Sequence, residues 1–309
     1  MIPVPDCPLH RVDDDTPVAV ARQLQRAAGT SLVRLARGLY ADRARWGDLD
    51  DRSRHLIRVS AVVGCLPAGS VFGGESALLL HGIRLLARAP NRVVVVEPRD
   101  RVDRRSELLE RRPSSAGEVV RVWFGAEQVP VLDLAASAAA AARSMPFRDA
   151  VVVLDQVLRR GVPRAAIAAL IEVGSSRCRS QALTALAFAD ARSDSVGESV
   201  ARVVLHEAGA PEPELQHVFR SPDGLVARVD FWFPDQGVVV EYDGVVKYRD
   251  RTMRAGRSPE QVVIDEKRRQ DWICRDPAVR GFVRLDAHDL RSVPFVAATL
   301  RQAGVPAAG

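Results

Sequence analysis

The spacing of apolar and polar residues predicts a regular series of elements from residue 195 to the end of the chain. Helices are expected at 195–208 and 260–274, with a further helix inside 287–304. Strands are expected at 214–220, 225–233, 237–243 and 281–285, where valine and phenylalanine are frequent and turn-forming residues follow. The order of a helix, three strands, a helix, a strand and a helix predicts an antiparallel meander, extended by a crossover helix into a mixed sheet flanked by helices.

The first part of the chain gives a more mixed pattern. Helices are expected at 18–28, 51–63, 130–143, 147–159 and 163–173, and another after the Ser/Arg-rich segment 174–180. Ser70 to Ile83 is expected to hold a capping residue near Glu75 and Ser76 and then a helix, and 92–96 and 119–124 read as strands. The polar stretch 191–195 separates a domain of residues 1–190 from one of residues 191–309. The predicted class is therefore mixed α+β.

Composition limits the class of protein. The hydrophobic fraction of 47% and the charged fraction of 27% are those of an ordinary globular protein. A net charge of +5 makes polyanions plausible partners. The four cysteines have no CxxC spacing, which favours a reducing compartment over a zinc site. With no signal-peptide pattern and no apolar run long enough to cross a bilayer, we expect a cytoplasmic protein without membrane contact.

Lysine is confined to one region of the chain. Two of the 44 basic residues are lysine, Lys247 and Lys267, and the other 42 are arginine. The same region carries Asp230, Glu241 and Asp243 beside apolar runs, where a carboxylate needs solvent, a partner or a metal. If 229–243 forms a hairpin, Asp230 and Glu241 meet at the sheet end away from the turn, and Glu241 and Asp243 share a face. Three such carboxylates would suit Mg²⁺.

These residues resemble the motifs of the PD-(D/E)XK endonuclease superfamily, and more closely its very-short-patch-repair-like members. The matching segments are GES (197–199), RVDFWFP (228–234), VVVEYDGVVKY (238–248), DEKRRQD (265–271), FVRL (282–285) and HDL (288–290). The resemblance implies an αβββαβ core, with Asp230 and Glu241 as ligands of Mg²⁺ or Mn²⁺ and Glu198 assisting them. Asp243 stands where the superfamily usually has lysine, so the lysine role would pass to Lys247 or Lys267.

Structural roles are also open for several of these residues. Glu198 and Ser195 form a capping-box pattern, Asp243 begins a turn dipeptide, and Lys267 lies at ion-pair spacing from Asp271. Gln216 could contact phosphate or support the site. The arginines that could contact nucleic-acid phosphates, or equally form a solvated surface, are Arg249, Arg257, Arg268, Arg269 and Arg284.

The amino-terminal half resembles AbiEi-type antitoxins of abortive-infection systems. The resemblance rests on LVRLARGLY (32–40), VFGGESALLLHGI (71–83) and VPVLDLAASAA (129–139). It implies a regulator with a shortened winged helix at 17–41, in which a basic helix passes Gly38 into a wing strand. Alternatively, Gly38 and Tyr40 turn and anchor a small packed unit.

The sequence leads to two functional hypotheses. The first is a metal-dependent nuclease that cleaves duplex or single-stranded DNA, in phage defence or DNA repair. The second is a non-catalytic DNA-binding regulator or antitoxin-like protein with a cognate toxin partner. RNA as the target and a homodimer are both compatible with the sequence.

Overall fold

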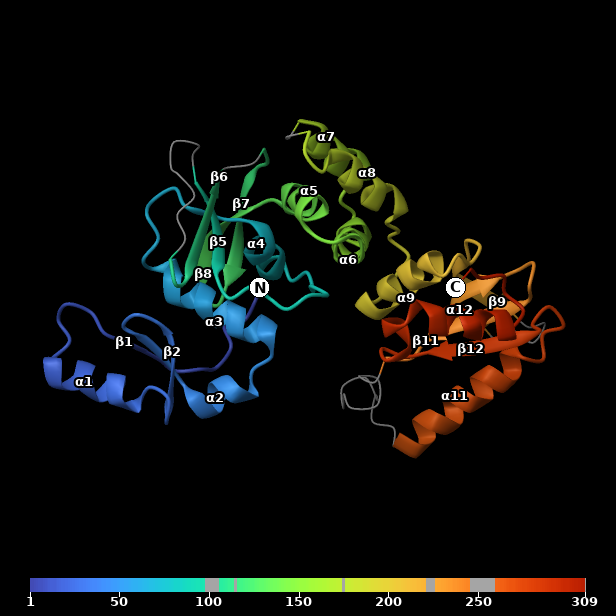
Figure 1. Ribbon diagram of the computed structural model, residues 1–309, viewed down its shortest axis with the longest axis horizontal. Coiled ribbons are helices and arrows are strands. Elements are labelled where there is room, and N and C mark those ends of the chain that lie inside the picture. The colour runs from blue at the N-terminus through green and yellow to red at the C-terminus, as the bar shows by residue number, and fades with distance from the viewer. Residues whose placement is uncertain (98–105, 114–115, 174–175, 221–225, 245–258, 309) are drawn as a thin grey trace. The chain divides into compact units, whose positions relative to one another are not determined.

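The computed structural model describes residues 1–97, 106–113, 116–173, 176–220, 226–244 and 259–308 (Figure 1). The chain divides into two compact units, Met1–Ala189 and Asp190–Gly309, one residue from the predicted boundary. Both units combine helices with sheets, so the predicted α+β class is confirmed. In the described ranges, no helix is both long and apolar enough to pass through a membrane.

A small three-stranded sheet opens the N-terminal unit. Its strands, in spatial order, are β1 (Leu9–Arg11), β3 (Leu39–Asp42) and β2 (Leu32–Ala36), with helices α1 (Val18–Ala27) and α2 (Arg43–Asp48). The prediction of a basic helix leading to Gly38 is wrong, because residues 32–36 pair antiparallel with β3. Gly38 makes the turn with φ of 72°, a conformation that favours glycine, and Tyr40 is buried. These two residues therefore turn and anchor a packed unit.

A five-stranded sheet forms the centre of the N-terminal unit. Its spatial order is β6 (Leu109–Pro113), β5 (Val93–Glu97), β4 (Val71–Phe72), β8 (Glu127–Leu132) and β7 (Val119–Phe124). The helices that follow or precede these strands are α3 (Asp51–Val63), α4 (Gly74–Leu80), α5 (Leu134–Ser144), α6 (Phe147–Arg159), α7 (Arg164–Val173) and α8 (Arg179–Phe188).

Two predicted helix starts in this unit are wrong. Residues 130–132 belong to strand β8, and α5 begins only after Asp133, whose Oδ1 accepts a hydrogen bond from the backbone N–H of Ala136 at 2.9 Å. Helix α4 begins after Gly73, before the residues expected to cap it. Ser76 cannot act as the cap because its hydroxyl accepts from the backbone N–H of Val94 and contacts the ring of His55.

The C-terminal unit has the predicted order of elements. They are α9 (Val196–Glu207), β9 (Glu214–Arg220), β10 (Val226–Phe233), β11 (Val238–Tyr242), α11 (Pro259–Ile273), β12 (Gly281–Leu285), the short 3-10 helix η1 (Asp289–Arg291) and α12 (Val293–Gln302). Strands β9, β10 and β11 pair antiparallel, and β12 joins β11 in parallel. The predicted mixed sheet is thus confirmed. The turn-forming residues between β9 and β10, at 221–225, lie outside the described residues.

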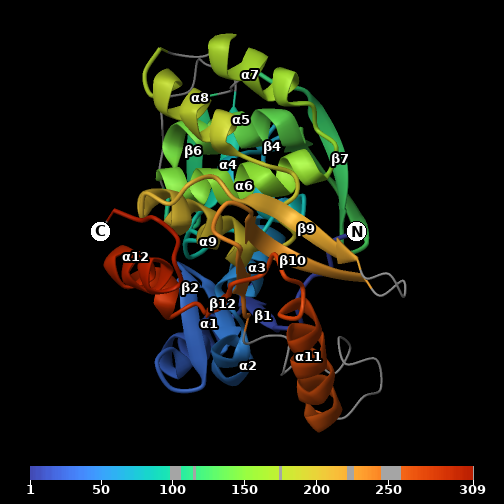
Figure 2. The same cartoon turned by 90° about the vertical axis from the view of Figure 1, so that its right-hand side faces the viewer.

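Two apolar layers cover this sheet. One contains Val204 of α9, Val296 of α12 and Phe231 of β10, and the other contains Ile273 of α11 and Trp232 of β10. Figures 1 and 2 show α11 and α12 on opposite sides of β12. The sheet therefore lies between a pair of helices and a single crossover helix.

Strands β9 and β10 change sides in the middle of their length. Side chains two residues apart on a strand normally share a face. However, Val229 packs in the α11 layer while Phe231 packs in the α9/α12 layer, and Phe219 and Leu215 differ in the same way on β9. The change falls at Asp230 and at Gln216, whose φ is 54°. Gln216 and Asp230 therefore stand at the points where the apolar side chains of their strands change from one layer to the other.

Candidate active site

Four polar residues follow one another across the four strands of the C-terminal sheet. Continuing the register of each pair places Gln216 opposite Asp230 and Asp230 opposite Glu241, and Glu241 pairs directly with Arg284. We call this set, Gln216, Asp230, Glu241 and Arg284, the polar row. The predicted hairpin between β10 and β11 thus brings Asp230 and Glu241 to neighbouring positions, at the sheet end away from the turn.

Asp230 takes part in the hydrogen bonding of the sheet itself. Its Oδ2 accepts a hydrogen bond from the backbone N–H of Tyr242 at 2.9 Å, just beyond the last recorded pair, Phe231 with Val240. The carboxylate thereby supplies an acceptor where the regular ladder stops. This contact fixes one oxygen of Asp230 relative to β11.

Glu241 forms an ion pair with Arg269 of α11. Arg269 Nη2 lies 2.7 Å from Glu241 Oε1, and Glu241 is only 8% exposed. The same guanidinium donates to the backbone oxygen of Arg228. Burial acts to lower the pKa of Arg269, but the hydrogen bond and charge of Glu241, with the charges of Glu266 and Asp230, leave that pKa raised. Arg269, expected as a phosphate contact, therefore serves to balance a buried carboxylate.

Glu198 is held at the start of α9. Its backbone N–H donates to Ser195 Oγ at 3.1 Å, which confirms Ser195 as the helix cap. Its Oε2 accepts from the backbone N–H of Asp194 and from Nε2 of Gln216, each at 2.8 Å. In a regular capping box the side chain of Glu198 would accept from the backbone N–H of Ser195, whereas here it accepts from that of Asp194. Glu198 is also hydrogen-bonded to Gln216, a member of the polar row.

Tyr242 joins α9 to the end of β11. The position of a Cβ added to Gly197 would lie 1.9 Å from Cε1 of Tyr242, so the ring rests directly on the first turn of α9. Burial raises the pKa of Tyr242, and the charges of Asp286 and Asp243 raise it further. The sequence analysis did not single out this contact, although a glycine two residues after a helix cap was a signal for a close approach.

The three carboxylates predicted to share a metal are not gathered to ligand spacing in the described part of the chain. Asp243 follows the end of β11, where its backbone N–H donates to the oxygen of Leu285 at 2.8 Å and continues the pairing with β12. Asp230 and Glu241 alone stand side by side. Two adjacent carboxylates fit the oxygen preference of Mg²⁺, although Arg269 occupies one oxygen of Glu241.

A different acidic group does have ligand spacing. Among the residues that the structure describes, Asp286, His288 and Asp289 place their ligand atoms within 4.8 Å of one another. Asp286 Oδ1 accepts from the backbone N–H groups of His288 and Asp289, and Asp289 Oδ2 accepts from that of Asp286. These backbone hydrogen bonds lower the pKa of Asp286. The group is explained as the turn that starts η1.

The predicted basic residues have different surroundings. Lys267 and Arg268 are exposed on α11, whereas Arg284 belongs to the polar row, and its Nη2 lies 3.9 Å from Glu266 Oε1. Glu266 and Arg269, one helical turn apart on α11, form an ion pair at 3.5 Å. The predicted residues Lys247, Arg249 and Arg257 lie outside the described residues.

In the N-terminal unit, a buried histidine joins three segments. His55 Nδ1 lies 2.8 Å from the oxygen of Pro90, and Nε2 lies 2.9 Å from Ser76 Oγ. Burial lowers the pKa of His55 to about 4. Because Pro90 oxygen can only accept, Nδ1 carries the proton and Ser76 donates to Nε2, while Ser76 also accepts from Val94. His81 is the C-terminal cap residue of α4, and its Nε2 contacts the oxygen of Leu132.

The fold and the polar row define an α+β protein of two units, the second built on a mixed sheet with paired carboxylates. No protein-family model matches the chain. It is 30% identical over 263 residues to the proteins Rv2248 and MT2308 of two Mycobacterium tuberculosis strains, both described as uncharacterized, covering 77% of this chain and 88% of each relative. The chain belongs to the family of these two proteins. The RV2827C protein of Mycobacterium tuberculosis is a structural neighbour with a TM-score of 0.34 and 17% identity, covering 68% of this chain and 78% of that one.

Proposed function

We propose that the C-terminal unit is a metal-dependent nuclease that cleaves phosphodiester bonds in DNA. The observation that carries the proposal is the placement of Asp230 opposite Glu241 at one end of the mixed sheet. These two carboxylates would hold Mg²⁺ or Mn²⁺, and Asp243, two residues after Glu241, would have to move closer to join them. When bound, such an ion polarises the phosphodiester and lowers the pKa of a water that attacks it.

The surrounding residues have separate tasks in this proposal. Gln216 and the backbone of Asp194 keep Glu198 oriented beside the polar row. Arg269 balances the charge of Glu241 before a cation arrives. Lys267 and Arg268, which are exposed on α11, would attract the phosphate backbone. Lys247, Arg249 and Arg257 would add to this attraction, with Lys247 as the second candidate for the lysine role.

A second candidate function is non-catalytic DNA binding by a regulator or antitoxin-like protein. The ion pair between Arg269 and Glu241 favours it, because a guanidinium occupies a carboxylate oxygen that a metal would need. Asp243 at the usual lysine position favours it as well. In this case the N-terminal unit would bind promoter DNA, and a cognate toxin or a second copy of the chain would be a partner.

Plasmid cleavage distinguishes the two functions. The full chain would be incubated with supercoiled plasmid, single-stranded DNA or RNA, with Mg²⁺ or Mn²⁺, beside Glu241→Gln. Glu212→Gln is the matched control, because Glu212 is an exposed carboxylate of the same unit. We expect metal-dependent cutting that Glu241→Gln abolishes and Glu212→Gln retains. DNA binding without cutting by any of the three proteins would support the regulator instead.

A further inference from the structure

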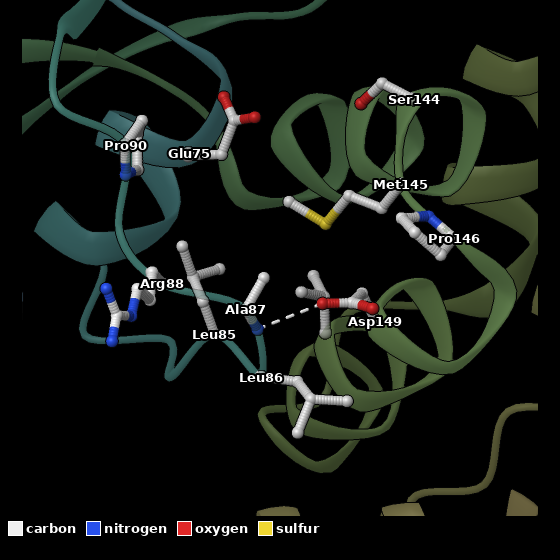
Figure 3. A pocket seen from close by; sticks show the side chains of 11 residues that line it. Glu75, Leu85, Leu86, Ala87, Arg88, Pro90, Ser144, Met145, Pro146 and Asp149 are labelled. Carbon is white, nitrogen blue, oxygen red and sulfur yellow. Dashed lines mark hydrogen bonds between the residues drawn. The ribbon is translucent and has the colours of Figure 1, made fainter.

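A pocket of about 190 Å³ lies in the N-terminal unit, far along the sequence from the polar row (Figure 3). It is bounded by the 85–90 segment, by α4 and by the junction of α5 with α6. Its apolar wall is formed by Leu85, Leu86, Met145, Pro146 and Val153. An apolar cavity of about 150 Å³ is large enough for benzene, so this pocket has room for a ligand of similar size.

Two carboxylates are set among these apolar side chains. Asp149, in the first turn of α6, uses Oδ1 to accept a hydrogen bond from the backbone N–H of Ala87 at 3.0 Å. Glu75, on α4, is paired with Arg112 at 3.1 Å. The two approach the pocket from different elements, and the thioether of Met145 extends between them (Figure 3). The lining therefore offers negative charge at its edge and a polarizable apolar surface between.

The nearby arginine does not cancel the charge of Asp149. Arg88 also lines the pocket, but its side chain is 92% exposed and its Nε lies 3.5 Å from Asp51. The hydrogen bond to Asp149 comes instead from an uncharged backbone N–H, which brings no cation to the carboxylate. Pockets with apolar walls and a few placed polar groups are the usual form of small-molecule sites. Here the polar groups would repel an anion and attract a cation.

We propose that this pocket binds a small organic cation with an apolar body, namely an alkylammonium ion. Its ammonium group would pair with Asp149, and its alkyl chain would pack against Leu85 and Met145. The alkyl chain would displace water from the apolar walls and so strengthen the charge pair. This site is independent of the polar row and of the proposed nuclease.

Calorimetric titration of the full chain with n-pentylamine tests the proposal, with 1-pentanol as an uncharged probe of similar size. We expect saturable binding of the amine in the millimolar range or better, as is usual for so small a ligand. Because each change removes one charge of the ammonium–carboxylate pair, 1-pentanol should bind the wild type, and n-pentylamine should bind Asp149→Asn, at least about tenfold more weakly. Asparagine keeps an acceptor for Ala87, so the local fold is preserved.

A second variant and a control complete the test. Leu86→Lys, at a 41% exposed rim position, introduces a tethered ammonium group that should compete with the added amine and weaken its binding. Glu118→Gln removes an exposed carboxylate of the same unit outside the pocket and should leave binding unchanged. Equal binding of the alcohol and the amine, no saturation, or unchanged affinity in Asp149→Asn would overturn the proposal. Tighter binding of Nα-acetyl-lysinamide than of n-pentylamine would overturn a small free amine as the ligand in favour of a lysine side chain of a peptide.

Discussion

Gln216 lies opposite Asp230 at the position where β9 and β10 both change the side of the sheet on which their apolar residues pack. The φ of 54° at Gln216 is rare for a residue with a side chain and shows where the change occurs. Its amide also reaches Glu198 at 2.8 Å. One strained residue thus connects the first helix of the unit to the carboxylates of the sheet.

The strain at Gln216 predicts an unusual order of stability. A protein with glycine inside a strand is normally less stable than one with alanine at the same position, by roughly 0.5–1 kcal/mol. At φ of 54°, however, alanine carries a conformational penalty of about 1–2 kcal/mol that glycine avoids, and this exceeds the usual cost of glycine. Both variants lose the hydrogen bond to Glu198, so Gln216→Gly should be more stable than Gln216→Ala. Urea denaturation of the two proteins measures this, and the opposite order would show that the backbone is not strained.

Removal of Arg269 should destabilise the C-terminal unit unless a cation replaces it. Arg269→Ala leaves Glu241, which is 8% exposed, without its partner. We expect a loss of about 2 kcal/mol, below the range for fully buried pairs because Arg269 is 29% exposed. If Asp230 and Glu241 bind metal, Mg²⁺ should raise the melting temperature of this variant more than that of the wild type. Equal shifts in the two proteins would argue against metal at Glu241.

Gly197 should not tolerate a methyl group. Alanine favours a helix over glycine by about 1 kcal/mol, yet Gly197→Ala should destabilise by about 1–3 kcal/mol because its Cβ would overlap the ring of Tyr242. Gly64→Ala is the control, since no atom lies within 4 Å of its added Cβ and its φ is −75°. The double variant Gly197→Ala/Tyr242→Leu should recover part of the loss. Thermal unfolding of the four proteins checks this, and an unaffected Gly197→Ala would refute the close contact.

His55 should make the N-terminal unit sensitive to acid. Its pKa is about 4 in the folded protein and near 6.5 in the unfolded chain, so only the unfolded chain binds its proton between these values. The contribution of neutral His55 to the free energy of unfolding is therefore fully present above pH 6.5. It falls by about 3 kcal/mol as the pH is lowered toward 4. The difference in unfolding free energy between wild type and His55→Gln, measured from pH 7 to pH 4, should shrink by this amount. An imidazole NMR titration with a midpoint near 6.5 would disprove it.

The sequence predicted the C-terminal unit better than the N-terminal one. Its strands are marked by valine runs and turn residues, so the β10–β11 hairpin and the pairing position of Asp230 and Glu241 could be predicted. Residues 32–36 could not, because a short basic and apolar segment fits a helix as well as a strand until its pairing partner is known. The ion pair of Arg269 depends on how the crossover helix α11 lies on the sheet, and no local pattern encodes that placement.

The change of sides at Gln216 and Asp230 also has a consequence for strand alignment. In a strand that alternates regularly, a slip of two residues returns every side chain to the same face, so such errors are weakly penalised. Here a two-residue slip of β9 along β10 would move Gln216 away from Asp230, and in one direction it would also place Leu215 opposite Val229, which packs in the other apolar layer. The pairing of Gln216 with Asp230 therefore favours the observed register of β9 on β10 over registers shifted by two residues.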